Sequence, residues 1–523
     1  MHTSPPELVL ALLIAVAVLV TVARGVGIAY PILLLIGGLA LGLVPGLPRF
    51  HFEPHLILVF VLPPLLYIAA YFTPVRNFRA NAGTIGALAV GLVVATALAV
   101  AAVVRMLVPD VPWSVAIALG AIVAPPDAVA ATAIAARLGL PRRIVTILEG
   151  ESLVNDATAL TIYGLAVAVA AGAAFSAEEA LTTFAGAFFG GGAIGLVLAW
   201  SIAKIRIRLQ DTPVEMTISL LTPFAAYLSA ERLGASGVIA TVAAGLYLGQ
   251  RGSEIMGADA RLTGRAVWET ITFLLNGFVF IVMGIEVPVI LRALSVAEAL
   301  RLVAIGLAIC GVLVVVRTVF IFATMYAPRL LRHAGDDPGR FACSIVISWA
   351  GMRGVVSLAA ALGLPTMLPT GGPFPARDAV VVVTVTVIVF TLLGQGLTLP
   401  WIIRRLRLAS DVTLHAEEAT AREQLVEAAT RRIDELYPVW PGHRPLLDQL
   451  RGTYAHRSEH LQHQRETEDT HDREMIEHRE IRRTVIDAER EALMRLRAAG
   501  EISDEVLRDL ERELDLEERR MDA

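Results

Sequence analysis

Long apolar runs recur along the chain from Leu8 to about Ile403, separated by short polar stretches. Each run is roughly 18 to 25 residues long, enough for a helix to cross the ~30 Å hydrocarbon core of a bilayer. The expected spans are residues 8–24, 28–47, 55–73, 81–105, 112–136, 143–171, 178–203, 214–231, 236–250, 266–287, 297–326, 340–367 and 378–403. With 55% hydrophobic residues, the 523-residue chain is too apolar for an ordinary soluble protein. The pattern predicts an all-α, polytopic membrane protein of about thirteen transmembrane helices.

The composition of the chain changes near Ser410. From residue 409 to the end it holds 29 Asp and Glu against 18 Arg, a net charge of −11, which leaves 26 basic and 20 acidic residues (+6) before it. Hydrophobic residues in this last part are sparse and locally spaced as in a helix. We expect residues 1–408 to form the membrane domain and residues 409–523 a soluble, regulatory tail of two or three amphipathic helices.

Basic residues in the short loops gather on one side of the predicted membrane. One set of loops contains Arg24, Arg76, Arg79, Arg137, Arg142, Arg143, Lys204, Arg206, Arg208, Arg251, Arg261, Arg265, Arg329, Arg332, Arg340, Arg404, Arg405 and Arg407, whereas the opposite set contains mainly Arg49, Arg105, Arg232, Arg292 and Arg377. The positive-inside rule then places the N-terminus outside and the tail in the cytoplasm. This orientation requires an odd number of spans, in agreement with thirteen.

The sixth predicted span carries a polar patch. Glu151 and Asn155 are four residues apart, as are Ser152 and Asp156, so the four side chains share about one turn of helix. A carboxylate facing lipid costs at least about 2.5 to 3.5 kcal/mol, so the patch should face the bundle interior or a water-filled cavity. The patch either serves transport or only holds helices together through a buried ion pair. For Glu151 we favour the ion pair, because Arg317 lies within the eleventh span and needs a buried anion.

Two other spans contain helix breakers. Pro125 and Pro126 stand next to Asp127 in the fifth span, and consecutive prolines remove backbone donors and interrupt a helix. In the twelfth span Arg353 lies in the glycine-rich stretch 351–354. If spans 1–6 and 8–13 are inverted repeats, the two interruptions correspond to one another. Interrupted helices at equivalent positions of two repeats indicate a transporter site where they meet.

Five short motifs stand in a fixed order within these spans. They are Leu62-Pro63-Pro64-Leu65-Leu66-Tyr67, Pro125-Pro126-Asp127, Gly150-Glu151-Ser152-Leu153-Val154-Asn155-Asp156, Asn276-Gly277 and Gly351-Met352-Arg353-Gly354. Together they resemble the ordered motifs of the monovalent cation/proton antiporters, in the sodium/proton exchanger branch. The resemblance covers most of residues 5–408 and points to a bacterial type with a cytoplasmic helical tail.

This resemblance implies a secondary transporter that exchanges Na⁺ for H⁺ across a bacterial plasma membrane and so serves pH and sodium homeostasis. It implies a homodimer embedded in lipid, in which a core of helices 4–6 and 11–13 moves against a dimerisation domain of helices 1–3 and 7–10. Cations and protons are the substrates, and no cofactor is expected.

The resemblance also implies roles for particular residues. Asp156 and Asp127 would form the Na⁺ site, with Ser152, Glu151 and Asn155 beside it. Charge in the core would be balanced by Arg353 and Arg317, next to the break at Pro125 and Pro126.

Two departures from the family pattern bear on cation selectivity. Many relatives have Thr where this chain has Pro126, and Glu where it has Ile68, so a hydroxyl ligand is missing. The Asn155-Asp156 pair resembles that of electroneutral exchangers, because one carboxylate that holds either a proton or a monovalent cation exchanges them one for one. The cation can be Na⁺, Li⁺ or K⁺, and K⁺/H⁺ exchange is the alternative to Na⁺/H⁺ exchange.

Two other classes of protein compete with the transporter. A cation channel or sensor needs similar polar spans, and an intramembrane aspartyl protease would use Asp127 and Asp156 as its two carboxylates. Pro-Pro before Asp127 and the thirteen spans argue against the protease. No nucleotide-binding loop or basic block indicates ATP or nucleic acid. In the tail, His456, His460, His463 and His471 have helical spacing that could bind a metal or sense pH, although a solvated face is the commoner explanation.

Overall fold

The computed structural model of the protein describes residues 5–26, 29–44, 59–138, 140–173, 176–209, 211–292, 294–330, 338–368, 372–406, 412–463, 468–499, 501 and 504–522. Within these residues every regular element is a helix, and the β-structure is limited to an isolated bridge between Met367 and Pro373. The all-α fold expected from the apolar pattern is confirmed. The chain divides into two compact units, Met1–Ser410 and Asp411–Ala523.

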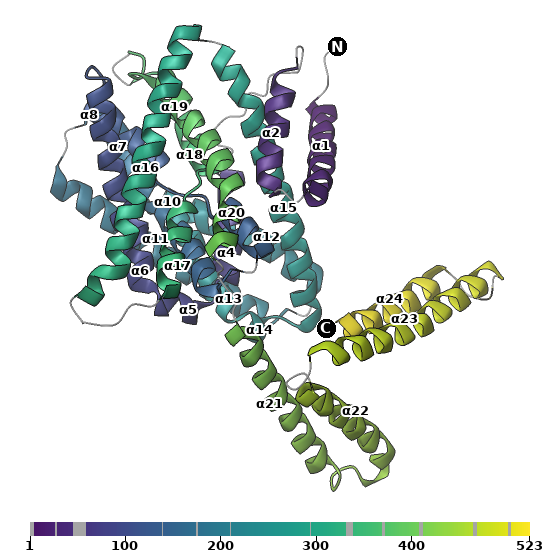
Figure 1. Cartoon of the computed structure of the whole chain (residues 1–523). Coiled ribbons are helices and arrows are strands. Elements are labelled where there is room, and N and C mark those ends of the chain that lie inside the picture. The colour runs from purple at the N-terminus through teal and green to yellow at the C-terminus, as the bar shows by residue number, and fades with distance from the viewer. Residues whose placement is uncertain are drawn as a thin grey trace. The chain divides into compact units, whose positions relative to one another are not determined.

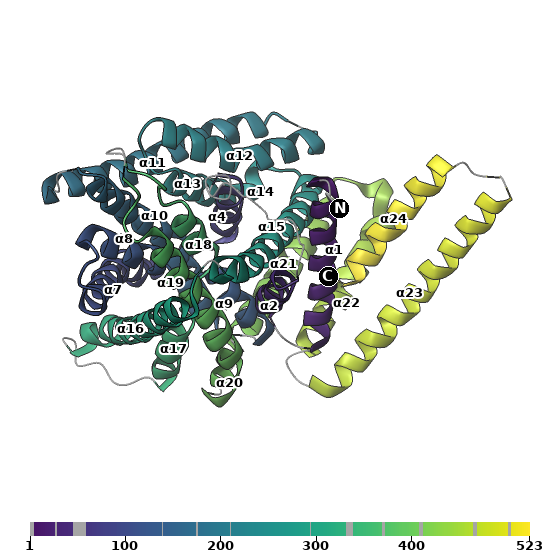
Figure 2. The ribbon, with the colours of Figure 1, turned by 90° about the horizontal axis from the view of Figure 1, so that it is seen from above.

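The first unit is a bundle of apolar helices (Figures 1 and 2). Its helices are α1 (Pro5–Val26), α2 (Tyr30–Gly42), α4 (Leu62–Phe72), α5 (Val75–Ala80), α6 (Ala82–Gly86), α7 (Val93–Leu107), α8 (Trp113–Val123), α9 (Ala128–Leu138), α10 (Arg142–Ala170), α11 (Ala177–Arg206), α12 (Thr212–Arg232), α13 (Gly237–Gln250), α14 (Gly252–Ile255), α15 (Ala258–Arg292), α16 (Val296–Leu330), α17 (Pro338–Trp349), α18 (Val355–Leu362), α19 (Arg377–Phe390) and α20 (Gly396–Leu406).

Six stretches of described helix are long and apolar enough to cross a membrane by themselves. They are Ala82–Leu107, Arg143–Ala170, Leu181–Arg206, Ala258–Pro288, Val296–Tyr326 and Arg377–Leu406, and several shorter apolar helices lie between them. The number of crossings therefore stays a prediction. All six overlap spans that were predicted from the length of the apolar runs.

The helices of the first unit pack in two groups. In one, α15 packs along α2, and α13 packs against α4, α11 and α12. In the other, α8 packs against α7 and α10, and α16 packs against α7, α17 and α19. Figure 2 shows α11, α12 and α13 along one edge and α16 and α17 near the opposite edge, with α10 and α18 between them.

A glycine pair brings α2 and α15 into backbone contact. A Cβ atom added to Gly38 would lie 2.8 Å from the Cα of Gly284, closer than real Cβ contacts allow. Small residues that let backbones approach are a main source of helix association in membranes, where lipid is as apolar as the side chains. The contact holds the middle of α15 firmly against α2.

Two spans are interrupted where the sequence predicted. Helix α8 ends at Val123 and α9 begins at Ala128, so the chain between them, with Pro125, Pro126 and Asp127, is not helical. Helix α17 ends at Trp349 and α18 begins at Val355, so residues 350–354 between them are not helical. Both breaks arise from residues that lack a backbone donor or a Cβ, and both predictions are confirmed.

Two helices of the first unit contain a π-helical segment. One is η1 (Ala87–Leu92), which joins α6 to α7, and the other is η2 (Thr391–Gln395), which joins α19 to α20. A π-turn widens the helix by one residue and is frequent at functional sites. Segment η2 carries Thr391, whose hydroxyl faces the interruption of the twelfth span.

The second unit consists of two helical hairpins. In the first, α21 (Val412–Leu436) packs against α22 (Arg444–His463), with the short 3₁₀ turn Pro441–His443 before it. In the second, α23 (Glu468–Ala498) packs against α24 (Asp504–Asp522). The described part of the tail thus contains four α-helices, and the expectation of two or three was wrong because charged residues mask the short apolar seams.

Each tail hairpin has a small apolar seam and exposed ion pairs. Ile486, Leu493 and Leu507 are buried in the second hairpin. Arg490 donates hydrogen bonds to Glu518 (2.7 Å) and Asp515 (2.6 Å), and these bonds raise the pKa of Arg490. Exposed ion pairs contribute little to stability, so the seam holds the hairpin. The side chains of His456, His460, His463 and His471, for which metal binding was considered, lie outside those described.

Candidate functional site

The two interrupted spans meet at a backbone hydrogen bond. The N–H of Asp127 donates to the carbonyl oxygen of Met352 over 2.6 Å, which joins the break of the fifth span to that of the twelfth. Non-helical backbone inside a membrane leaves polar groups that only protein or a cavity can satisfy. This crossing therefore demands partners for the carbonyls and N–H groups freed at both breaks.

Arg353 satisfies several of these free carbonyls. Its guanidinium donates to the carbonyl oxygens of Val123 (2.8 Å), Ala124 (3.2 Å) and Gly351. Its backbone N–H donates to the Thr391 hydroxyl over 3.0 Å. Arg353 is 2% exposed, so its positive charge lies against the negative ends of two half-helices. That it stabilises the broken core stays a prediction, to which these contacts give a structural basis.

Asp127 caps the N-terminus of α9. Its Oδ1 accepts a hydrogen bond from the N–H of Val129 over 2.8 Å, as an N-cap carboxylate does. The positive end of the α9 dipole favours the charged carboxylate. Gly354 leaves the space that this carboxylate fills, because a Cβ at Gly354 would overlap its Oδ2. The glycine after Arg353 is thus needed for a close approach between the two breaks.

Glu151 and Arg317 form the predicted ion pair. Arg317 donates to both carboxylate oxygens of Glu151, over 2.6 and 2.8 Å, and both side chains are at most 2% exposed. The Nε of Arg317 also donates to the carbonyl oxygen of Ile347 over 3.1 Å. The pair joins α10, α16 and α17, and the prediction is confirmed.

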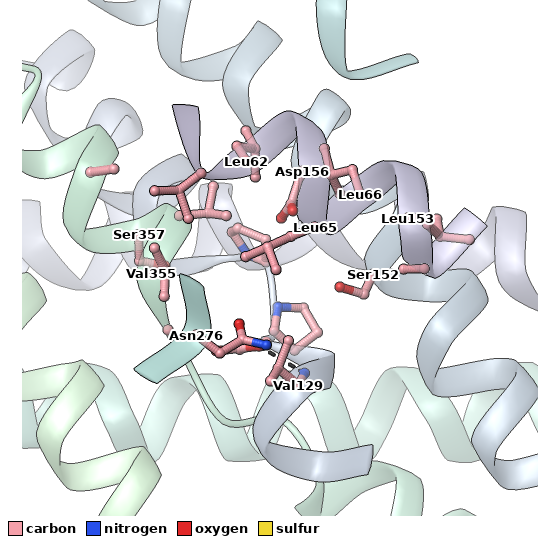
Figure 3. A pocket seen from close by; sticks show the side chains of 18 of the residues that line it. Leu62, Leu65, Leu66, Val129, Ser152, Leu153, Asp156, Asn276, Val355 and Ser357 are labelled. Carbon is pink, nitrogen blue, oxygen red and sulfur yellow. Dashed lines mark hydrogen bonds between the residues drawn. The ribbon is translucent and has the colours of Figure 1, made fainter. Parts of the chain in front are cut away.

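A cavity of about 150 Å³ lies beside the crossing of the breaks. Its polar lining comes from Asp127, Glu149, Ser152, Asp156 and Asn276, together with Ser357 and Thr132. Its apolar wall includes Val61, Leu62, Leu65, Leu66 and Ala69 of the α4 region. Figure 3 shows Asp156 and Ser152 of α10 on one side of the cavity, with Asn276 and Val129 across from them. A cavity of this size holds a small ion with several waters.

The polar patch of the sixth span divides between two environments. Ser152 and Asp156 line the cavity, whereas Glu151 faces Arg317, and neither Glu151 nor Asn155 is among the lining residues. Adjacent residues of a helix point about 100° apart, so Glu151 and Ser152 can face different surroundings within one turn. Sequence spacing alone could not show that the pair Glu151 and Asn155 faces away from the cavity that Ser152 and Asp156 line. Asp156 is 5% exposed and, among the described residues, forms no ion pair. It is a buried carboxylate at a cavity, and no cationic side chain of the described residues forms an ion pair with it.

The two departures from the family pattern occupy different places. Pro126 lines the cavity, where a hydroxyl would face it. Ile68 instead packs in a cluster with Tyr67 and Trp268 and is not among the lining residues.

Four polar lining residues, Thr132, Glu149, Asn276 and Ser357, had no role assigned from the sequence. Glu149 lies two residues before Glu151, Ser357 follows the second break, and Asn276 stands in the apolar tenth span. The sequence did indicate that Asn276 has a polar partner, because burying an amide in an apolar span costs free energy unless it is hydrogen-bonded. Its neighbours across the cavity come from distant parts of the chain, which spacing does not reveal.

Broken helices that cross beside a cavity with buried carboxylates define the site of an ion-coupled secondary transporter. The sodium/hydrogen exchanger transmembrane family model matches residues 9–405, and the chain belongs to this family. It is an integral membrane transporter, not an enzyme, and it exchanges a monovalent cation for protons.

Similar proteins agree with this assignment. An uncharacterized Na(+)/H(+) exchanger of Mycobacterium tuberculosis strain H37Rv is 34% identical over 519 residues, which cover 98% of this chain and 95% of the relative. A sodium, potassium, lithium and rubidium/H(+) antiporter of Bacillus subtilis is 30% identical, over 87% of this chain and 69% of its own. The solved structure of the sodium proton antiporter MjNhaP1 from Methanocaldococcus jannaschii has the same fold, with a TM-score of 0.58 and 19% identity over 77% of this chain and 98% of that one.

Proposed function

We propose that Asp156 is the group at which the cation and the proton alternate, and that Asp127 and Ser152 complete a Na⁺ site beside it. The observation that carries the proposal is the burial of the Asp156 carboxylate on the cavity without an ion-pair partner among the described residues. A buried carboxylate is costly when it is charged and empty, and either a proton or a cation removes that cost. The two occupants therefore exclude one another.

The nearby arginines are engaged elsewhere, which supports the same assignment. The Arg317 guanidinium is held by Glu151, and the Arg353 guanidinium is held by backbone carbonyls at the breaks. Glu151 and Asn155 then act as structural neighbours of the site rather than as cation ligands. Their role is to hold α10 in the orientation that directs Asp156 to the cavity.

Exchange at Asp156 is one Na⁺ for one H⁺ and is electroneutral. Moving a net charge would couple transport to the membrane potential by about 2.3 kcal/mol per elementary charge and 100 mV. Only the occupied forms of the site cross, because the empty, charged form is too costly to move through the bundle. Na⁺ is the expected cation. K⁺ is the alternative, and it is also among the cations named for the Bacillus subtilis relative.

The alternation needs two bodies that move against each other. The core comprises the spans of α6 to α10 and α16 to α20, and the spans of α1 to α4 and α11 to α15 form the body that holds two copies together in a lipid-embedded homodimer. The N-terminus faces outside and the tail of residues 409–523 faces the cytoplasm of a bacterial cell, where it regulates exchange. The transporter then serves pH and sodium homeostasis.

Flux in proteoliposomes tests this proposal. A Na⁺ gradient should drive opposite proton movement at a rate that an imposed membrane potential does not change. Stimulation by potential would contradict electroneutral exchange, and cation conductance without proton movement would indicate a channel. Equal rates with K⁺ would reject Na⁺ selectivity. Asp156→Asn should abolish exchange while the protein remains folded, because an amide neither binds a proton nor balances a cation.

A further inference from the structure

Asn276 presents an amide oxygen to the transport cavity from the side opposite Asp156. The residue lies in α15, is 2% exposed and lines the cavity with Asp127 and Asp156. Its Oδ1 accepts no hydrogen bond from the described residues. Figure 3 shows its side chain pointing into the cavity over Val129, the residue whose N–H is capped by Asp127. The oxygen is therefore available to whatever occupies the cavity.

The amide oxygen suits a small monovalent cation. An Asn carbonyl has two acceptor lone pairs and no charge, and hard cations select oxygen ligands. A neutral ligand adds coordination without adding a second negative charge, so the site still exchanges one cation for one proton. The oxygen also adds a ligand in a site where Pro126 supplies no hydroxyl.

Asn276 comes from a different part of the bundle than the carboxylates. Helix α15 packs along α2, with the Gly38–Gly284 backbone contact fixing it there, whereas Asp127 and Asp156 belong to the α9 and α10 region. The cavity thus has carboxylates on one wall and an amide on another. A cation held by both walls loses the amide when the walls separate.

We propose that the Oδ1 of Asn276 is a neutral oxygen ligand of the transported cation and favours the small cations Na⁺ and Li⁺ over K⁺. A smaller ion dehydrates more reluctantly and depends more on each oxygen that replaces its water. This inference rests on the proposed site at Asp156, because the amide assists a carboxylate that already holds the cation.

A pair of matched variants separates the oxygen from the shape of the side chain. Asn276→Thr keeps a side-chain oxygen. Asn276→Val has nearly the same shape as the threonine variant but has no side-chain oxygen. In proteoliposomes at fixed pH, Asn276→Val should raise the half-saturating Na⁺ and Li⁺ concentrations about tenfold, the change expected when one polar contact of ~1.4 kcal/mol is lost. The K⁺ value should change less, and Asn276→Thr should stay close to the wild-type protein.

The same preparations distinguish failure of this inference from failure of the proposed function. If Asp156→Asn still exchanges at the wild-type rate, the site itself is wrong. If Asp156→Asn is inactive while Asn276→Val keeps wild-type half-saturation for every cation, or Val and Thr have equal effects, only the role of Asn276 is overturned.

A second readout covers variants that fold but do not transport. Na⁺ should raise the melting temperature of detergent-solubilised wild-type protein and of Asn276→Thr, and it should raise that of Asn276→Val less. An undiminished Na⁺ effect on Asn276→Val would overturn the inference. If that variant does not purify, Asn276→Ser and Asn276→Ala provide the same comparison.

Discussion

The Arg317 guanidinium donates to both carboxylate oxygens of Glu151, across 166 positions of sequence. The pair joins α10 to α16, and a third hydrogen bond from Arg317 to Ile347 adds α17. Helix α10 carries Asp156 on another face, toward the cavity. In the proposed mechanism this polar motif has two roles: Glu151 fixes the helix, and Asp156 binds the ions.

Breaking this pair should destabilise the protein strongly. Glu151→Gln or Arg317→Met alone leaves a buried charge without its partner, at a cost of about 3 to 5 kcal/mol. The double variant should recover part of that loss. Melting curves in detergent on the two single variants and the double variant measure the coupling. Purely additive losses would mean that the pair does not contribute as a unit.

Arg353→Lys should impair exchange although it keeps the positive charge. A lysine ammonium is a single point of donors on a flexible stem and cannot bridge Val123, Ala124 and Gly351 as the planar guanidinium does. We expect a lower melting temperature and exchange at least ~10-fold slower, corresponding to ~1.4 kcal/mol or more. Arg265→Lys, at an exposed ion pair with Glu269, is the matched control and should behave as the wild-type protein. Equal behaviour of the two variants would reject the role given to Arg353.

Gly354→Ala should disturb the site by a single methyl group. The added Cβ would overlap the Asp127 carboxylate, so the carboxylate or the backbone of the break must move. We expect a higher half-saturating cation concentration and slower exchange. Gly311→Ala is the control, because nothing lies within 4 Å of a Cβ at that position of α16. A Gly354→Ala protein with wild-type kinetics would show that the Asp127 position is not critical.

Removing the tail after Ser410 should leave the exchange reaction intact. The residues of the cavity all belong to the first compact unit, and the tail forms a unit of its own. We expect Na⁺-driven proton movement in truncated protein, with a changed pH response or dimer stability. A truncated protein that inserts and dimerises normally but exchanges at no pH would make the tail part of the transport mechanism.

Local chemistry explains which features were predictable. The break at Pro125 and Pro126 follows from the missing backbone donors, and the pairing of Glu151 with Arg317 follows because each buried charge requires the other. These arguments need only residue types and spans.

Features that depend on packing between distant segments were not predictable. Spacing by four placed Glu151 with Asn155 and Ser152 with Asp156 on about one turn of helix, but Glu151 of α10 faces Arg317 whereas Asp156 faces the cavity. Asn276 meets Asp127 and Asp156 in one cavity only because α15 packs beside the breaks. The expectation of two or three tail helices was also too low for the described residues, since the apolar seams of these helices are short.

The dependence of cation affinity on pH tests the exchange site most directly. If a proton and a cation compete for Asp156, lowering the pH should raise the half-saturating Na⁺ concentration, approaching about tenfold per pH unit where protons occupy most of the sites. Exchange should slow at low pH and recover with more Na⁺. Asp110→Asn, at an exposed loop position, is the matched control and should follow the wild-type curve.

The decisive measurement is Na⁺-driven proton flux in proteoliposomes, recorded against Na⁺ concentration at several pH values for the wild-type protein and Asp156→Asn. The proposed mechanism predicts a wild-type half-saturation that rises as pH falls and a folded Asp156→Asn protein without exchange. A wild-type half-saturation that is constant with pH, or an Asp156→Asn protein exchanging at the wild-type rate, would place the transport site elsewhere.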